Sequence, residues 1–161
     1  MKKKLLALML ITLMLFCGCK ADDPTPALAA AVDAYIQNEV YDGESLPLML
    51  EYQNAILSEI TYEIQSYDMK KGTMEVNFTY IDVLNLADSI TDQDLSEEDY
   101  YAACIEKIRA ENYSTISEVV CVYFEASEEG YTLTQSDELA NVLSGGVLDY
   151  YLELMEEMGY E

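Results

Sequence analysis

The sequence contains no histidine and no tryptophan, and it is poor in basic residues, with 8 Lys and Arg against 31 Asp and Glu. Without histidine, catalysis by an imidazole base and metal sites with imidazole ligands are excluded. The formal net charge of −23 repels phosphate backbones, so we expect no nucleic-acid partner. The hydrophobic fraction of 51% is too high for a disordered acidic tail. The 161 residues therefore predict one folded, acidic domain.

Long apolar runs are also scarce, and the clearest one lies near the N-terminus. Residues 5–16 are apolar apart from Thr12, and they follow lysines at positions 2–4. This run is shorter than the ~20 residues of a membrane-spanning helix. A basic start followed by a short apolar run is typical of a secretory signal peptide.

Gly18 and Cys19 follow the apolar run and resemble the lipobox of bacterial lipoproteins, in which the cysteine becomes the lipidated first residue. We therefore predict a signal peptide over 1–18, a lipidated Cys19 with a short tether over 19–25, and one domain over 26–161. A transmembrane anchor or secretion without lipid are the alternatives. The chain after residue 18 keeps five basic residues against 31 acids, a net charge of −26. Acyl chains rather than a charged surface would then hold it on the outer face of the cell membrane.

Helical and strand periods divide the domain into two hairpins with helices between and around them. The helical period predicts helices at about 25–40, 46–57, 84–89, 96–109, 136–143 and 147–159. Alternation predicts one hairpin over 60–80 and a second from strands 113–126 and 131–133. Thr25, Ser96 and Ser136 are the expected N-caps, and Gly145 and Gly146 should separate the last two helices. The pattern predicts an α+β fold with a four-stranded antiparallel sheet from two hairpins and helices packed on one face.

Four segments resemble small Gram-positive lipoproteins of domain-of-unknown-function families with a cystatin-like (nuclear-transport-factor-2-like) fold. They are 60–64 (ITYEI), 76–79 (VNFT), 130–133 (GYTL) and 143–146 (LSGG). The resemblance implies a cystatin-like fold and a lipid anchor. It implies no activity and no catalytic residues.

The first hairpin presents a continuous apolar face, formed by Met74, Val76, Phe78 and Tyr80. The expected cover is the apolar stripe of helix 96–109, formed by Tyr101, Ile105 and Ile108. Space between them would make a pocket for a small apolar ligand, with Met74, Val76, Phe78, Tyr80 and Tyr101 as its ligand-binding residues. Without such space, the same side chains are ordinary core. By elimination we predict a binding or interaction module, whose partners are the membrane and a protein or a small apolar ligand.

One alternative is an isomerase-like enzyme, which would need a carboxylate base and a phenol donor in an apolar pocket. Glu118 shares strand parity with Val120, which favours the packed face, where Tyr62, Tyr80 or Tyr123 could supply the phenol. The competing interpretation is that Glu118 lies near a strand end and reaches solvent. The sequence has no nucleophile elbow, phosphate loop or zinc-ligand spacing, and we expect no cofactor.

A second alternative is a weak calcium site in the acidic segment that contains Asp92, Asp94, Glu97, Glu98 and Asp99. An EF-hand beginning at Asp92 would need glycine where Glu97 stands and an acid where Ala103 stands, so that motif fails. The competing interpretation is a solvated loop followed by a helix whose first turn favours acids.

Once the predicted signal peptide, which contains Cys17, is removed and Cys19 is lipidated, the remaining cysteines are Cys104 and Cys121. An extracytoplasmic location permits a disulfide between them. Their apolar neighbours instead favour two buried thiols, which are common core residues.

Overall fold

A computed structural model of the chain describes residues 23–158 except 44, 91–94 and 129. The predicted signal peptide and Cys19, the predicted lipidation site, lie outside the described residues. The helices are α2 (Thr25–Asn38), α3 (Leu48–Ser58), α4 (Val83–Asp88), α5 (Glu97–Arg109), α6 (Asp137–Leu143) and α7 (Val147–Glu157). The strands are β1 (Thr61–Asp68), β2 (Thr73–Ile81), β3 (Thr115–Ser127) and β4 (Gly130–Leu133).

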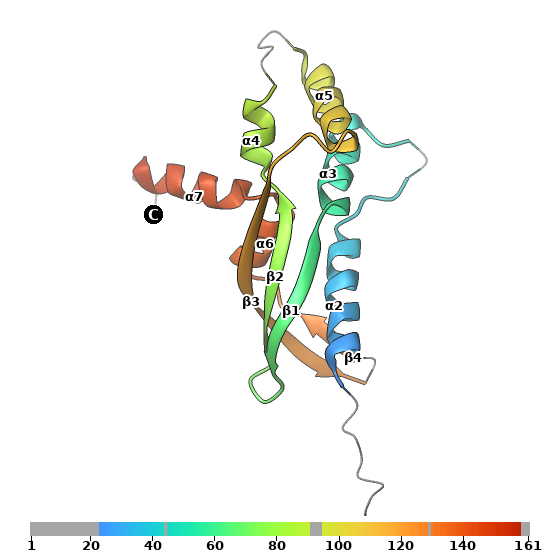
Figure 1. The fold of residues 1–161 in the computed structure, drawn as a ribbon, viewed down its shortest axis with the longest axis vertical. Coiled ribbons are helices and arrows are strands. Elements are labelled where there is room, and N and C mark those ends of the chain that lie inside the picture. The colour runs from blue at the N-terminus through green and yellow to red at the C-terminus, as the bar shows by residue number, and fades with distance from the viewer. Residues whose placement is uncertain (1–22, 44, 91–94, 129, 159–161) are drawn as a thin grey trace, which may run out of the picture.

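The four strands form one antiparallel sheet in the order β1-β2-β3-β4, which confirms the α+β class and both predicted hairpins. Helices α4 and α5 lie in the connection between β2 and β3, which nevertheless pair directly (Figure 1). Strand β2 therefore has a partner on each side, which places its side chains at the centre of the sheet.

The first hairpin contains an irregularity that the alternating pattern did not predict. The register of β1 against β2 shifts between Ile64 and Ser66, so that Tyr67 rather than Ser66 lies opposite Met74. A bulge of one residue changes which side chains face the core, because successive residues of a strand alternate between the two faces.

Two of the three predicted N-caps are confirmed. The Ser96 and Ser136 hydroxyls accept hydrogen bonds from the amides of Asp99 and Leu139 at 3.1 and 3.2 Å. The prediction for Thr25 is wrong: the helix already includes Thr25, its N-cap is Pro24, and the Thr25 hydroxyl donates to Asp23 instead.

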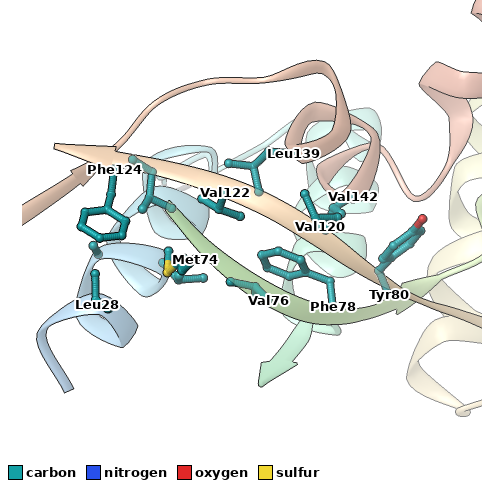
Figure 2. Close-up of a cluster of buried hydrophobic side chains, with 13 residues drawn as sticks. Leu28, Met74, Val76, Phe78, Tyr80, Val120, Val122, Phe124, Leu139 and Val142 are labelled. Atoms are coloured by element: carbon teal, nitrogen blue, oxygen red, sulfur yellow. The ribbon is translucent and has the colours of Figure 1, made fainter. Parts of the chain in front are cut away.

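One apolar core, here called the sheet cluster, lies between the sheet and helices α2 and α6 (Figure 2). Its buried residues come from three sources, namely the two helices, the inward face of β2, and β3 with β4. They are Leu28, Ala31, Val32, Met74, Val76, Phe78, Tyr80, Val120, Val122, Phe124, Leu133, Leu139 and Val142. Burial on this side gives the sheet one packed face, as antiparallel sheets commonly have.

A second apolar core, here called the helix cluster, lies where α3, α4 and α5 meet at one end of the sheet (Figure 1). Its buried residues are Tyr52, Ile56, Ile81, Val83, Leu86, Cys104, Ile105 and Ile108. The predicted arrangement, with helices packed on one face of the sheet, therefore holds for α2 and α6 but not for α3, α4 and α5. The prediction that Tyr101, Ile105 and Ile108 cover the face of the first hairpin is wrong, because α5 packs against α3 instead.

Helices α6 and α7 are separated by Gly145 and Gly146, as predicted, and both glycines have positive φ angles of 68° and 84°. A Cβ at Gly145 would lie 2.3 Å from Val83 Cγ2 and 2.9 Å from the Ile81 carbonyl oxygen, so only glycine fits this approach. The buried side chain of Asn141 receives a hydrogen bond from the Asp149 amide and donates one to the Asp149 carboxylate. These contacts fix the direction in which α7 leaves the domain.

The two cysteines of the domain are thiols in different environments. Cys104 is buried in the helix cluster, which agrees with its interpretation as a core thiol. Cys121 is exposed on the sheet face opposite the sheet cluster, so the prediction that it is buried is wrong. The alternative of a disulfide between them is not realised in this structure.

Candidate functional site

The residues predicted to line a pocket are divided between the two clusters. Met74, Val76, Phe78 and Tyr80 are at most 1% exposed in the sheet cluster, where side chains of α2, α6 and β3 pack against them (Figure 2). Tyr101 packs against the helix cluster instead. The burial of these four residues corresponds to the second interpretation given above, in which they are ordinary core rather than the wall of a pocket.

Tyr101 lines a different hollow, of about 680 Å³, between the C-terminal half of α2, helices α3 and α5, and the α6–α7 junction. We call it the tyrosine groove, after the tyrosines in its wall: Tyr35, Tyr41, Tyr52, Tyr100, Tyr101 and Tyr151. Apolar side chains such as Ile56, Val83 and Val147 form much of the remaining wall. Of these residues, sequence reasoning selected only Tyr101.

Three of these tyrosines form an aromatic wall because α3 and α5 pack side by side. The rings of Tyr52 and Tyr101 lie 5.5 Å apart between centroids, and those of Tyr100 and Tyr101 lie 5.7 Å apart in an edge-to-face arrangement. Such spacings are favourable for aromatic pairs. Tyr52 is anchored in the helix cluster, whereas Tyr100 and Tyr101 are only partly buried.

The position of Tyr41 at the groove is fixed by an amide clamp rather than by burial. The Asn54 side chain on α3 accepts a hydrogen bond from the Tyr41 amide at 2.9 Å and donates one to its carbonyl at 2.8 Å. The two bonds tie the segment after α2 to α3, while the Tyr41 side chain remains exposed. The groove therefore has a positioned aromatic residue at its margin.

Gln53 lines the same groove and provides its most unusual polar group. Its Oε1 atom is buried and has no hydrogen-bond partner in the described part of the chain. An unpaired buried amide oxygen costs about 1–3 kcal/mol, so native proteins rarely keep one without a reason.

Several phenols of the groove wall have raised pKa values, which favours their neutral form. Burial is the main cause that raises the pKa of Tyr52 and of Tyr35, and the Glu39 carboxylate adds to the effect on Tyr35. Burial, together with the neighbouring Cys104, raises the pKa of Tyr100 to about 12. The groove thus offers ring faces and uncharged hydroxyls at neutral pH.

The carboxylate and phenol proposed for the isomerase alternative do meet, but away from the groove. Glu118 faces the packed side, as predicted, and its carboxylate accepts a hydrogen bond from the Tyr80 hydroxyl at 2.7 Å. Tyr62 donates to Asp33, and Tyr123 is exposed on the opposite face of the sheet. The Tyr80 hydroxyl is therefore occupied by Glu118, and neither residue lines the tyrosine groove.

Only some of the acidic residues considered as calcium ligands belong to the described part of the chain. Asp92 and Asp94 lie outside the described residues. Glu97, Glu98 and Asp99 form the first turn of α5, where the Asp99 carboxylate accepts a hydrogen bond from the Ser96 hydroxyl. Within the described ranges, no three Asp, Glu or Cys side chains gather as a metal site would require.

No protein-family model matches the chain, and comparisons with curated proteins and with solved structures give no significant match. In the part of the chain that the structure covers, no helix combines the length and apolarity of a membrane span. The structure itself shows an α+β domain with a tyrosine-lined groove at one end of its sheet.

Proposed function

We propose that this chain is a lipid-anchored extracytoplasmic binding module and that the tyrosine groove is its binding site. The observation that carries this proposal is a hollow of about 680 Å³ with six tyrosines in its wall. Ligand sites are typically concave and largely apolar, of roughly 300–1,000 Å³, with a few placed polar groups.

The lipid anchor rests on Gly18 and Cys19 after a run of signal-peptide length. The arrangement of α2 is compatible with it, because α2 begins at Thr25, the last residue of the proposed tether, and reaches the groove at Tyr35. Ten helical residues span about 15 Å. The start of α2 and the cluster of α3 and α5 lie toward opposite ends of the domain (Figure 1). The groove would therefore lie on the side remote from the membrane.

The finer fold assignment belongs to the same proposal, namely a cystatin-like domain of a small Gram-positive lipoprotein family. It is supported by the long helix α2 on one face of a four-stranded antiparallel sheet. The helices of the helix cluster would then be additions to this fold, with α3 before the first hairpin and α4 and α5 between β2 and β3.

The anchor is tested by Cys19→Ser in the full chain expressed in a Gram-positive host. We expect the variant to leave the membrane fraction, or to accumulate as an uncleaved precursor. Processing and detergent extraction identical to the wild type would contradict lipidation at Cys19.

The groove is tested with the full chain in phosphatidylcholine nanodiscs, with empty nanodiscs as the reference. Isothermal titration calorimetry with phenylbutanol, phenylbutylamine, phenylbutyltrimethylammonium and phenylbutanoate samples neutral, cationic and anionic end groups on one apolar body. Tyr101→Ala should weaken the tightest of these interactions about tenfold, because the aromatic wall loses one ring.

The matched control is Tyr123→Ala, because Tyr123 is exposed on the sheet face and does not line the groove. This variant should bind as the wild type does. The proposal is overturned if none of the four compounds binds, or if Tyr101→Ala and Tyr123→Ala have the same effect.

A further inference from the structure

We propose that helix α7 is a docking surface for another protein, which it recognises through a basic amphipathic segment of that partner. Two features of the molecule carry the proposal: α7 has an apolar face that its own domain leaves uncovered, and acids surround that face. The site is separate from the tyrosine groove, because Leu152 and Met155 on this face do not line the groove. It therefore does not depend on the binding function proposed above.

The side chains of α7 separate into an apolar side and an acidic side. Apolar residues recur with the helical period and share a stripe of about a third of the circumference. They are Leu148, Tyr151, Leu152, Met155 and Met158, here called the α7 face. The acids of the helix lie on its other side, and they are Asp149, Glu153, Glu156 and Glu157. A helix divided in this way normally turns its apolar side toward a core.

The domain leaves the α7 face open to solvent. None of the residues Val147–Glu157 is buried. The exposed fractions of Tyr151, Leu152 and Met155 are 58%, 49% and 46%. In Figure 1, the C-terminal half of α7 lies clear of every other described helix and strand. An apolar stripe held away from its own core is typical of an interaction site.

Hydrogen bonds at the base of α7 hold the helix in this position. The Asp149 amide donates to Asn141 Oδ1 at 3.0 Å, and Asn141 Nδ2 donates to the Asp149 carboxylate at 2.9 Å. The Leu148 amide donates to Ser144 Oγ at 3.2 Å. A helix that is already oriented loses little conformational freedom when it binds, so its exposed face is suited to docking.

The charge around the α7 face defines the partner. Residues 110–161 contain 12 acids and neither lysine nor arginine. A partner whose own apolar stripe is flanked by lysine or arginine would meet the acids of α7 at the rim of the interface, which speeds the encounter and fixes the register. The α7 face spans ten residues, or about 15 Å, so it matches about three turns of a partner helix.

The same charges disfavour two other occupants. In a pair of α7 helices from two copies of the chain, each acid would lie near acids of the other copy, and like charges across an interface are costly. A bilayer is also a poor match, because helices that lie in the membrane interface are rich in lysine and arginine on their polar face, and α7 has neither. A basic amphipathic segment fits both the apolar stripe and the acids.

The test replaces Met155 by the photoreactive residue p-benzoylphenylalanine in the full chain, carried in phosphatidylcholine vesicles. Illumination joins this residue covalently to whatever lies against it. The probe is the synthetic peptide LKKLLKLLKKLLKL, whose leucines form an apolar stripe flanked by lysines. We expect cross-linking to this peptide to saturate as its concentration rises. The acidic counterpart LEELLELLEELLEL should give only background cross-linking, because its charges repel those of α7.

The matched position is Tyr123, which is exposed on the sheet face at 52% and should give background cross-linking with either peptide. With the photoreactive residue at position 155, Leu152→Ser should weaken the basic peptide about tenfold, because it removes a central apolar contact.

Two charge variants distinguish α7 from the net charge of the chain. Glu153→Gln combined with Glu156→Gln should weaken binding of the basic peptide about threefold. Glu63→Gln combined with Glu125→Gln removes the same charge from exposed positions of β1 and β3 and should leave the affinity unchanged.

The cross-linked products identify any other occupant. Adducts with phosphatidylcholine would assign the α7 face to the bilayer, and adducts between two chains would assign it to a second copy. Either result overturns the proposal, as do equal yields with the two peptides or equal yields at positions 155 and 123. Binding of the phenylbutyl compounds in the groove is measured separately, so failure at α7 leaves the groove unaffected.

Discussion

The sheet cluster and the helix cluster use similar side chains but differ in how completely their polar atoms are paired. The sheet cluster buries aliphatic and aromatic side chains, and the hydroxyl of its one tyrosine, Tyr80, is bonded to Glu118. At the boundary of the helix cluster, Tyr100 and Tyr101 remain partly buried and the Gln53 oxygen remains unpaired. A filled core secures the fold, whereas a boundary with partly exposed aromatic side chains beside a hollow can still bind a ligand.

The largest difference between the clusters is expected from truncating one aromatic residue in each. Phe78→Ala removes a fully buried ring at the centre of the sheet cluster and should lower the free energy of unfolding by ~3–5 kcal/mol. Tyr101→Ala, at the groove, should cost only about 1–2 kcal/mol. Urea denaturation followed by circular dichroism gives both values. Equal losses would remove the distinction between a filled core and a binding margin.

The junction that joins the two clusters should be nearly as sensitive. Gly145→Ala places a methyl group against Val83 and the Ile81 carbonyl at a positive φ angle, and should cost about 2–4 kcal/mol. Gly43→Ala is the control, because its new methyl group would meet only the Leu46 side chain, at 3.1 Å. Similar urea midpoints for the two variants would contradict the close approach at Gly145.

The two thiols provide a comparison between a buried and an exposed site with the same chemical change. Cys104→Ser buries a hydroxyl in the helix cluster and should destabilise the domain by about 1–3 kcal/mol. Cys121→Ser lies on the exposed sheet face and should change the stability by less than about 0.5 kcal/mol. Thermal unfolding under reducing conditions measures both. A reversed order would mean that the burial of these cysteines is wrongly assigned.

The smallest expected effect concerns the stability of the domain at high pH. The pKa of Tyr100 is raised to about 12 by burial and by Cys104, compared with about 10 in an unfolded chain. The neutral form is therefore favoured by folding, and its stabilising contribution is complete below about pH 10 and lost as the pH rises from there toward 12. Tyr100→Phe should move the midpoint of alkaline unfolding upward, by on the order of half a pH unit. An unchanged midpoint would show that Tyr100 does not contribute to this loss.

The features that sequence patterns predicted correctly are those set by neighbouring residues. Alternation along β2 reports burial on one face, and Ser96 and Ser136 satisfy backbone amides only three positions away. Glu118 was placed correctly for the same reason, since strand parity decides its direction. Such local patterns depend little on how the rest of the chain is arranged.

The groove was missed because it depends on which helices pack together over long sequence separations. The stripe of Ile105 and Ile108 is apolar enough to cover a sheet or to meet another helix, and the pattern does not distinguish between the two. A signal was present at Gln53, a polar residue in line with Ile56 on the apolar stripe of α3. That Gln53 lines a groove becomes apparent only when the opposite wall, on α5, is known.

The absence of tryptophan gives the tyrosine groove an optical consequence. Ultraviolet emission from this protein must come from its 14 tyrosines, and six of them line one hollow. Rings 5.5–5.7 Å apart, as in the aromatic wall, are close enough to exchange excitation energy before they emit. Light emitted after such exchange loses polarisation, so the anisotropy of the native protein reports on the spacing of these rings. A molecule that enters the groove and shifts them would change that anisotropy without any attached label.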